Sequence, residues 1–519
     1  MERKWWTLVA VCVATFMLLL DITIVNVALP DIQKQTGAGF DELQWVVDAY
    51  SLALAGLLLA AGSLADRLGR RRAFVAGVGI FTIASFLCGV SGDATVLDFA
   101  RGLQGIGGAA MFATSLALLA QEFHGRERGT AFGVWGATIG GAVAIGPLVG
   151  GALTQGLGWE WIFFVNVPIG IATIALAQMR VRETKDPTAS GVDWIGTATF
   201  SGALIALVFA LIRGNAEGWG SPLIIGLLAA AVVLMVVFVV VELRQESPML
   251  DLALFRKPTF TGASIVAFAL SASMFAMFLY ITLYMQNILG FSPLDAGLRF
   301  LPLSLISFFV AAAAGPLSER FPKRIFFVLG LSLVGFALLW MGQAFRGGLT
   351  IDDGWTAMLG GFIVAGIGIG MINPPLAATA VGVVPPQRAG MGSGINTTFR
   401  QVGIATGIAG LGAIFQHQIS AKATELLAAS PVGAGQSGRV VTAIQSGRIG
   451  EVIAAAPPQA RGVIGRVAKE SFISGLNELF VIAGIVAFVG AASALVLVRS
   501  RDYVMSGAQA AEPEGAPAA

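Results

Sequence analysis

Charged side chains are scarce in this sequence. Only 12% of its 519 residues are Asp, Glu, Lys or Arg, and the mean hydropathy is +0.81. Soluble domains average about 25% charged residues, so the composition excludes an ordinary soluble domain and indicates a polytopic membrane protein. The net charge of +2 is too small to indicate nucleic-acid binding, and we expect no nucleic-acid partner.

Cysteine is also nearly absent. The chain has two cysteines, Cys12 and Cys88, each within an apolar segment. Two separated thiols provide neither a disulfide framework nor a metal cluster, so we expect no metal site and no redox chemistry.

A third absence concerns ATP. No Gly-Lys dipeptide occurs in the sequence, which excludes the phosphate-binding loop G-x-x-x-x-G-K-[ST]. No catalytic motif is found either. We therefore expect a protein that is not an enzyme, binds no cofactor and, if it transports, draws on an ion gradient such as that of protons.

Long apolar runs are what the sequence has instead. Crossing the hydrocarbon core of a bilayer, about 30 Å, takes about 20 apolar residues. The first run follows a basic start without a cleavage site, so we expect a retained helix rather than a secretory signal. An all-α membrane protein follows, with fourteen predicted spans at 7–28, 44–64, 73–91, 96–121, 129–154, 162–180, 194–212, 221–242, 259–287, 294–315, 326–343, 356–380, 391–416 and 473–499.

The distribution of Lys and Arg predicts the orientation. An even number of spans puts both termini on one side, and most basic residues then fall on that side. The short outer loops and their flanks hold only Lys34, Arg213, Arg299 and Arg346. By the positive-inside rule, both termini are expected in the cytoplasm. The Gly- and Ala-rich composition indicates a bacterium, so we expect the chain in a bacterial plasma (inner) membrane.

The chain contains an internal repeat. The stretch GSLADRLGRRR at 62–72 is matched by GPLSERFPKR at 315–324, and QGIGGAAM at 104–111 by AGIGIGM at 365–371. The repeat predicts two parallel six-helix halves with spans seven and eight inserted between them. Secondary transporters of this kind hold substrate between the halves at the membrane midplane.

The repeat also sets the expected domains. They are an N-terminal bundle at 1–185, a two-helix insertion at 186–258, a C-terminal bundle at 259–499 with a long outer connection at 417–472, and a disordered tail at 500–519.

Several motifs in the same order are similar to signatures of the major facilitator superfamily, in its fourteen-helix drug:proton antiporter branch. They are LDITIVNVALP, QWVVDAYSLALA, GSLADRLGRRR, RGLQGIGGAA, GAVAIGPLVGG, WEWIFFVNVPIG, DWIGT and GMGSGINTTFRQVGIATG. The resemblance covers residues 7 to about 500. It implies a major facilitator fold and export by alternating access.

Asp21, Arg101 and Asp48 are the candidates for proton coupling. An ionised carboxylate in a span costs about 3 kcal/mol on insertion scales. The resemblance implies that Asp21 is a proton-titratable group facing the central cavity, and that Arg101 couples to it together with Gln104. The alternatives are that Asp21 bonds Thr23 or Asn26 within its helix, and that a carbonyl anchors Arg101.

Asp48 and Arg400 are two further charged candidates within predicted spans. Asp48 either favours the positive end of a helix dipole or contacts a cation with help from nearby aromatic rings. Arg400 lies mid-span and needs a partner, as a structural or gating group. Phe275, Met277, Phe278, Met285 and Phe399 pack by default, although a subset could line an adaptable cavity. The candidate substrate cavity comprises Asp21, Asn26, Trp45, Asp48, Tyr50, Gln104 and Arg400.

The loop after span two is a candidate conformational latch. The resemblance implies that Asp66 makes a charge pair that holds the halves in the outward-facing state. Alternatively, its basic residues only mark topology and meet anionic lipid. The latch residues are Gly62, Asp66, Arg67, Gly69, Arg70, Arg71 and Arg72.

A glycine-rich run in span five is the last candidate. Small residues let helices approach closely, and proline bends the axis, so packing alone explains the run. The resemblance adds that it marks exporters, although Ala142 stands where the usual pattern has glycine. The run comprises Gly133, Gly146, Pro147, Gly150 and Gly151.

The sequence thus predicts a proton-coupled exporter of lipophilic, cationic drugs, in contact with protons and membrane lipids. We expect a monomer, with room for a periplasmic adaptor. One alternative is a dedicated exporter of a single metabolite, siderophore or lipid. Another is a non-transporting sensor or assembly factor that uses 417–472 as a docking arm.

Overall fold

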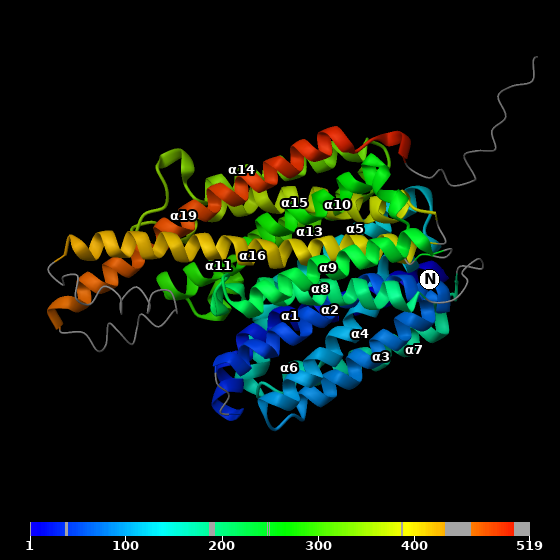
Figure 1. Ribbon diagram of the computed structural model, residues 1–519, viewed down its shortest axis with the longest axis horizontal. Coiled ribbons are helices and arrows are strands. Elements are labelled where there is room, and N and C mark those ends of the chain that lie inside the picture. The colour runs from blue at the N-terminus through cyan, green and yellow to red at the C-terminus, as the bar shows by residue number, and fades with distance from the viewer. Residues whose placement is uncertain are drawn as a thin grey trace, which may run out of the picture.

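The computed structural model describes residues 2–36, 40–185, 193–245, 248, 250–385, 388–430 and 458–502. Every regular element in these ranges is a helix, and most run along the long axis of the molecule (Figure 1). Twelve of the described helical segments are long and apolar enough to cross a membrane. Two more helices, α5 (Gly125–Gly156) and α13 (Leu301–Leu317), lie at the predicted spans five and ten, so the all-α polytopic class is confirmed.

In the first half, α4 and α5 each pack against neighbouring helices. α4 lies against α2 and α3, and α1 packs on α5. Span six is divided at Val165 into α6 and α7. The helices of this half are α1 (Arg3–Thr36), α2 (Phe40–Leu68), α3 (Arg70–Gly89), α4 (Ala94–Glu122), α5 (Gly125–Gly156), α6 (Trp161–Phe164) and α7 (Asn166–Arg180).

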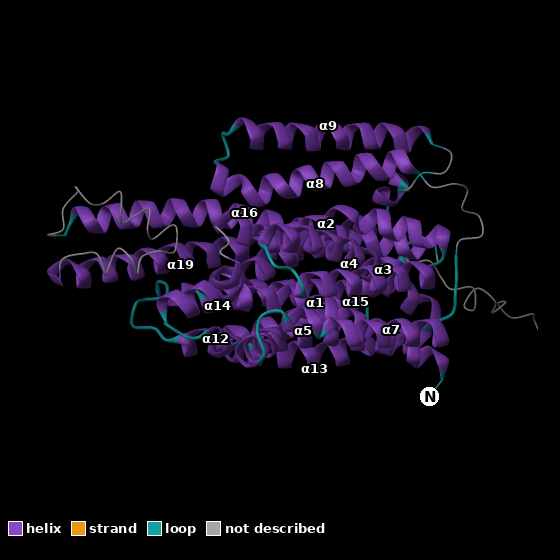
Figure 2. Ribbon diagram, turned by 90° about the horizontal axis from the view of Figure 1, so that it is seen from below, coloured by secondary structure: helices purple, strands orange, loops and turns teal. Residues whose placement is uncertain are grey.

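The predicted insertion forms a helical hairpin, α8 (Trp194–Glu217) and α9 (Pro222–Arg244). Capping explains both starts: the Asp193 carboxylate accepts a hydrogen bond from the Gly196 amide, and Ser221 precedes a proline at the first helical position. α8 packs on α2 and on α16, so the hairpin lies along both halves. α9 is outermost (Figure 2), and its exposed valines suit contact with lipid.

The second half begins after a short 3₁₀ turn, η1 (Leu252–Arg256). Its first span is one continuous helical run, Pro258–Ile288, with two π-helical stretches. The elements are α10 (Pro258–Leu270), η2 (Ser271–Phe275), α11 (Ala276–Leu283), η3 (Tyr284–Ile288), α12 (Pro293–Arg299), α13 (Leu301–Leu317), α14 (Lys323–Met341), η4 (Ala344–Arg346), η5 (Trp355–Met358), α15 (Leu359–Gly382), α16 (Ala389–Ala428), α19 (Pro458–Leu497) and η8 (Ser500–Asp502).

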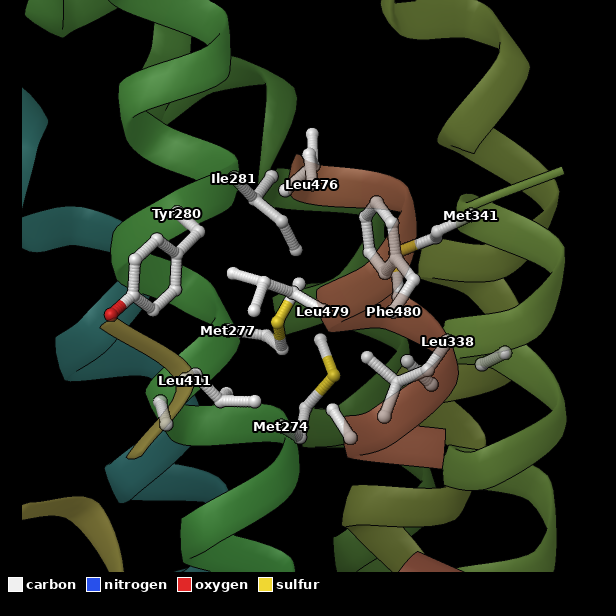
Figure 3. Packing of buried hydrophobic residues seen from close by; sticks show 14 of the residues in the cluster. Met274, Met277, Tyr280, Ile281, Leu338, Met341, Leu411, Leu476, Leu479 and Phe480 are labelled. Carbon is white, nitrogen blue, oxygen red and sulfur yellow. The ribbon is translucent and has the colours of Figure 1, made fainter. Parts of the chain in front are cut away.

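The core of the second half is apolar and rich in methionine. Figure 3 shows Met274, Met277 and Ile281 turned toward Leu338 and Leu479. All five side chains are buried. Met277 and Met285 are therefore packing residues, whereas Phe275 and Phe278 remain partly exposed.

Much of the predicted outer connection at 417–472 is helix. α16 continues to Ala428 and α19 begins at Pro458, and Figure 1 shows both projecting beyond the other helices. The Ala-, Gln- and Ser-rich composition leaves partial helix as one possibility for this segment, and its described ends are helical. A seam of buried residues joins them, including Ile419, Ala423, Leu427, Ile464 and Val467. Residues 431–457, and 503–519 of the predicted disordered tail, lie outside the described residues.

Candidate functional site

Asp21 and Arg101 form an ion pair inside the first half. Arg101 Nη1 lies 2.5 Å from Asp21 Oδ2, and each residue is only 1% exposed. Arg101 also donates to the Val46 carbonyl oxygen at 2.8 Å, and its guanidinium lies 4.4 Å from the centre of the Tyr50 ring. The carbonyl anchor and the carboxylate pair, considered as alternatives from the sequence, therefore coexist.

Gln104 connects the pair to further polar groups. Its amide nitrogen donates to Asp21 Oδ1 and to the Ser85 hydroxyl, both at 2.8 Å, and its oxygen accepts from Arg101 at 2.6 Å. Asn166 donates to Asp21 Oδ1 at 3.2 Å. All of these side chains are buried. The cluster thus gathers α1, α3, α4 and α7 around one carboxylate.

The position of Asp21 differs from the sequence expectation in one respect. Its contacts belong to the first half and it is almost fully buried, so in this conformation it lies within that bundle rather than facing a space between the halves. The reason is the Arg101 pair, which holds the carboxylate inside. The Thr23 hydroxyl instead donates to carbonyls of its own helix, and the Asn26 side chain lies outside the described residues.

Ser85 and Asn166 were not identified as site residues from the sequence. Asn166 lies within the motif WEWIFFVNVPIG, as the one amide side chain in an apolar stretch. That isolation was the available signal, because an amide buried in a span needs a hydrogen-bond partner.

Asp48 lies apart from this cluster. The charged groups that influence it are Arg213 on α8 and Asp98 on α4, and no described residue makes a hydrogen bond to its Oδ2 atom. Trp45 packs on Phe209 of α8, with ring centres 5.4 Å apart. Asp48 and Trp45 therefore face the inserted hairpin, whereas Tyr50 lies against Arg101.

The candidate latch joins the two halves. Asp66 accepts hydrogen bonds from the Gly390 and Met391 amides at 3.1 and 3.0 Å, and Arg70 Nε lies 2.8 Å from Asp66 Oδ1. Asp66 thus satisfies free backbone amides in the first turn of α16, where a negative charge is favourable. Close approach requires glycine here: a Cβ on Gly62 would lie 2.4 Å from the Gly390 oxygen.

Other loop residues support the turn that follows. Gly69 has φ of +117°, and a Cβ there would lie 2.6 Å from the Glu183 carboxylate. Glu183 in turn accepts from the Arg71 and Arg72 amides, both at 3.1 Å, and so caps α3. Arg67 donates to the Pro248 carbonyl oxygen at 3.4 Å. Glu183 was missed from the sequence because it is remote from the loop along the chain.

The second copy of the loop makes a related contact. Glu319 is four residues after Gly315, as Asp66 is after Gly62, and Lys323 Nζ lies 3.7 Å from its carboxylate. A Cβ on Gly315 would lie 2.0 Å from the Gly129 oxygen of α5. Each copy of the repeated loop motif therefore lies at a contact between the halves: the first copy where α2 meets α16, and the second where α13 meets α5.

The glycine run of span five packs against α1 and α13. A Cβ on Gly146 would lie 1.9 Å from Thr23 Oγ1, one on Gly150 would lie 2.9 Å from Ile24 Cγ1, and one on Gly133 would lie 3.0 Å from the Ala311 oxygen. Gly151 has no atom within 4 Å of such a Cβ. The Pro147 side chain lies outside the described residues.

Arg400 lies in the first third of α16, and its surroundings differ from those of Arg101. Arg400 Nη2 donates to Asn373 Oδ1 at 2.8 Å, and its guanidinium carbon lies 5.8 Å from the centre of the Phe275 ring. In the part of the chain that the structure describes, no carboxylate pairs with it. The same described residues contain no group of three or more His, Cys, Asp or Glu arranged to hold a metal ion.

Comparison with known proteins identifies the family. The profile of the Major Facilitator Superfamily matches residues 11–408. The chain is 33% identical over 497 residues to the tetracenomycin C resistance and export protein of Streptomyces glaucescens, covering 95% of this chain and 91% of that one. It is 35% identical over 492 residues to the multidrug resistance protein Stp of Mycobacterium tuberculosis, covering 92% and 89%.

The fold also has solved counterparts. The proton:xylose symporter XylE superposes with a TM-score of 0.62 over 96% of each chain, at 12% sequence identity. This likeness concerns the arrangement of helices alone.

Proposed function

Because the chain belongs to the Major Facilitator Superfamily, we propose that it is a proton-coupled exporter of amphipathic organic compounds, of the fourteen-helix branch. The family makes it a membrane transporter rather than an enzyme. Relatives that cover nearly the whole chain are named for drug resistance or export, which supports export as the direction. The inserted hairpin α8–α9 supports the fourteen-helix branch.

The ion pair between Asp21 and Arg101 is the observation that carries proton coupling. A guanidinium does not release its proton in a protein, so proton exchange falls to Asp21. Protonation of Asp21 leaves Arg101 buried without its charge partner, a change that costs about 3–5 kcal/mol for such pairs. An energy of that size is enough to shift a two-state equilibrium substantially.

Close packing of α5 against both α1 and α13 connects the Asp21–Arg101 pair to the interface between the halves. Gly146 and Gly150 of α5 contact α1 two and three residues beyond Asp21, at Thr23 and Ile24. The same helix meets α13 at Gly129 and Gly133. We propose that movement of α1 after protonation is passed through α5 to the inter-half contact, and so to the Asp66 latch. Alternating access would follow.

Orientation and cargo complete the proposal. The start of α1 and the end of α19 lie at the same end of the molecule (Figure 1), which supports a cytoplasmic location for both in the inner membrane. A cationic compound would compete for Asp21 in a conformation where the Arg101 pair is open. A dedicated exporter of one compound is the second candidate, because one relative is named for resistance to and export of tetracenomycin C.

The test is efflux of ethidium from cells that express wild type, Asp21→Asn or the control Asp295→Asn. Asp295 lies on the predicted outer surface and pairs with Arg299. We expect a protonophore to abolish wild-type efflux, Asp21→Asn to lose efflux at normal expression, and Asp295→Asn to retain it.

Two outcomes would contradict the proposal. If Asp21→Asn retained efflux that a protonophore abolishes, Asp21 would not be the proton site. Efflux by wild type that ignores the protonophore would exclude proton coupling. If a panel of unrelated compounds gave resistance to only one, the dedicated exporter would replace the multidrug exporter.

A further inference from the structure

Arg400 carries a positive charge that no carboxylate among the described residues balances. It lies near the middle of the predicted span 391–416, where an arginine costs about 3 kcal/mol on insertion scales. Arg101, a buried arginine of the first half, is paired with Asp21 at 2.5 Å. Arg400 has only the neutral amide oxygen of Asn373 as a described polar partner.

That hydrogen bond does not explain the charge. A glutamine at this position could also donate to the Asn373 oxygen, without the desolvation cost of a guanidinium. Because burying a charge without a counter-charge is unfavourable, the guanidinium is better explained by a partner that is present only part of the time. The partner must carry negative charge, and it must reach the middle of the membrane.

The location suits a transported molecule. Asn373 and Pro374 lie on α15 directly opposite α5: a Cβ on Gly136 would lie 3.7 Å from Asn373 Cβ and 3.3 Å from Pro374 Cγ. Arg400 therefore lies next to a contact between the two halves, where transporters of this architecture bind substrate. Its side chain is not fully enclosed, unlike that of Arg101.

Aromatic rings continue from this site. The Phe275 ring lies against Arg400, and its centre is 5.4 Å from that of Phe278. The series continues to Phe300 and Phe362, with ring centres 5.7 Å apart between Phe278 and Phe300 and 5.4 Å apart between Phe300 and Phe362. The core of this half is filled by other residues of the same helical run, Met274, Met277 and Ile281 (Figure 3). Phe275, Phe278 and Phe300 stay partly exposed, so flat apolar surfaces adjoin the free charge.

We propose that Arg400 and Asn373 bind an acidic oxygen, a carboxylate or phenolate, of an aromatic substrate whose rings lie against Phe275 and Phe278. Charge-assisted hydrogen bonds from a guanidinium to such an oxygen are strong and directional. Asn373 accepts from Arg400 and orients it, and its amide nitrogen is a further donor for the ligand. This inference rests on the proposed function as an exporter and adds an acidic group to the cargo, at a site separate from the Asp21 proton site.

The test compares two xanthene dyes of similar shape, anionic fluorescein and cationic rhodamine 6G. Binding to purified protein in lipid nanodiscs is measured by fluorescence anisotropy for wild type, Arg400→Gln and Arg400→Lys. Arg346→Gln, a change on an exposed outer turn, is the matched control. Size-exclusion profiles identify a variant that fails to fold. If Arg400→Gln fails to fold, Arg400→Lys is compared with wild type in its place.

We expect saturable fluorescein binding that weakens at least about tenfold in Arg400→Gln and less in Arg400→Lys, because lysine keeps the charge but not the planar donor geometry. Rhodamine 6G binding should change less than about twofold. Equal losses for both dyes, or no saturable binding of fluorescein to wild type, would overturn the inference. Because the assay needs no proton gradient, its result is independent of whether the proton-coupling proposal fails.

Discussion

At the residue scale, the Asp21 carboxylate depends on neighbours that the sequence motifs did not single out. Asn166 donates to Asp21 and reaches toward Ser85 at 3.5 Å. A hydrogen bond to a charged group contributes about 1.5–3 kcal/mol, so Asn166→Leu should lower the rate of proton-driven efflux about 10- to 100-fold. The measurement is initial efflux rate per folded protein.

Asn477→Leu is the matched control for that prediction. Asn477 makes two hydrogen bonds to the Leu349 backbone in the second half, so Asn477→Leu makes the same substitution without touching the Asp21 cluster. Equal efflux from Asn166→Leu and wild type would show that Asn166 only fills space.

At the element scale, α5 connects α1, the helix of Asp21, to the second half. The glycines of α5 differ in how much room they leave for a larger side chain. A Cβ at position 146 would lie 1.9 Å from Thr23 Oγ1, whereas one at position 151 would meet nothing within 4 Å. Overpacking of this kind costs about 1–3 kcal/mol. Gly146→Ala should therefore reduce efflux about 5- to 100-fold, while Gly151→Ala retains it.

The two alanine variants are compared for thermal stability as well as efflux. A lower melting temperature is expected for Gly146→Ala only. If both variants lost efflux equally, the effect would lie in helix flexibility rather than in the contact with α1.

At the scale of the whole molecule, two contacts hold the inner ends of the halves together. Asp66 caps α16 from the first half, and Gly315 of α13 fits against Gly129 of α5. Asp66→Asn removes the charge that satisfies the α16 amides, and Gly315→Val forces α13 away from α5. Both should open the inner end and shift the population toward the inward-facing state.

This opening is measured as the distance between two spin labels, by pulsed electron paramagnetic resonance. The labels are placed at positions 182 and 321, which are exposed inner residues of the two halves. Cys12 and Cys88 are first replaced by alanine, with efflux checked. We expect longer distances in both variants and an unchanged distribution in Asp295→Asn. An unchanged distribution in all three would remove the latch role from Asp66.

The sequence by itself determined the class and the plan of the molecule. Low charge, long apolar runs and the repeated GSLADR and GPLSER motifs predicted a helical membrane protein of two related halves, because lipid leaves the backbone little choice but helix. Asp21 and Arg101 were also identified from sequence, since charged residues within apolar runs are costly enough to stand out, whereas Gln104 was implied by the family resemblance.

Only the tertiary structure decided which of these residues meet. Asp21 and Arg101 are 80 positions apart, and Asp66 reaches amides more than 320 positions away. Asp48, with the same carboxylate as Asp21, instead faces the inserted hairpin. Partners of this kind follow from how helices pack, and helix packing depends on side-chain shape at distant positions. For the same reason the sequence identified Arg400 as costly, while only its surroundings revealed that no described carboxylate compensates it.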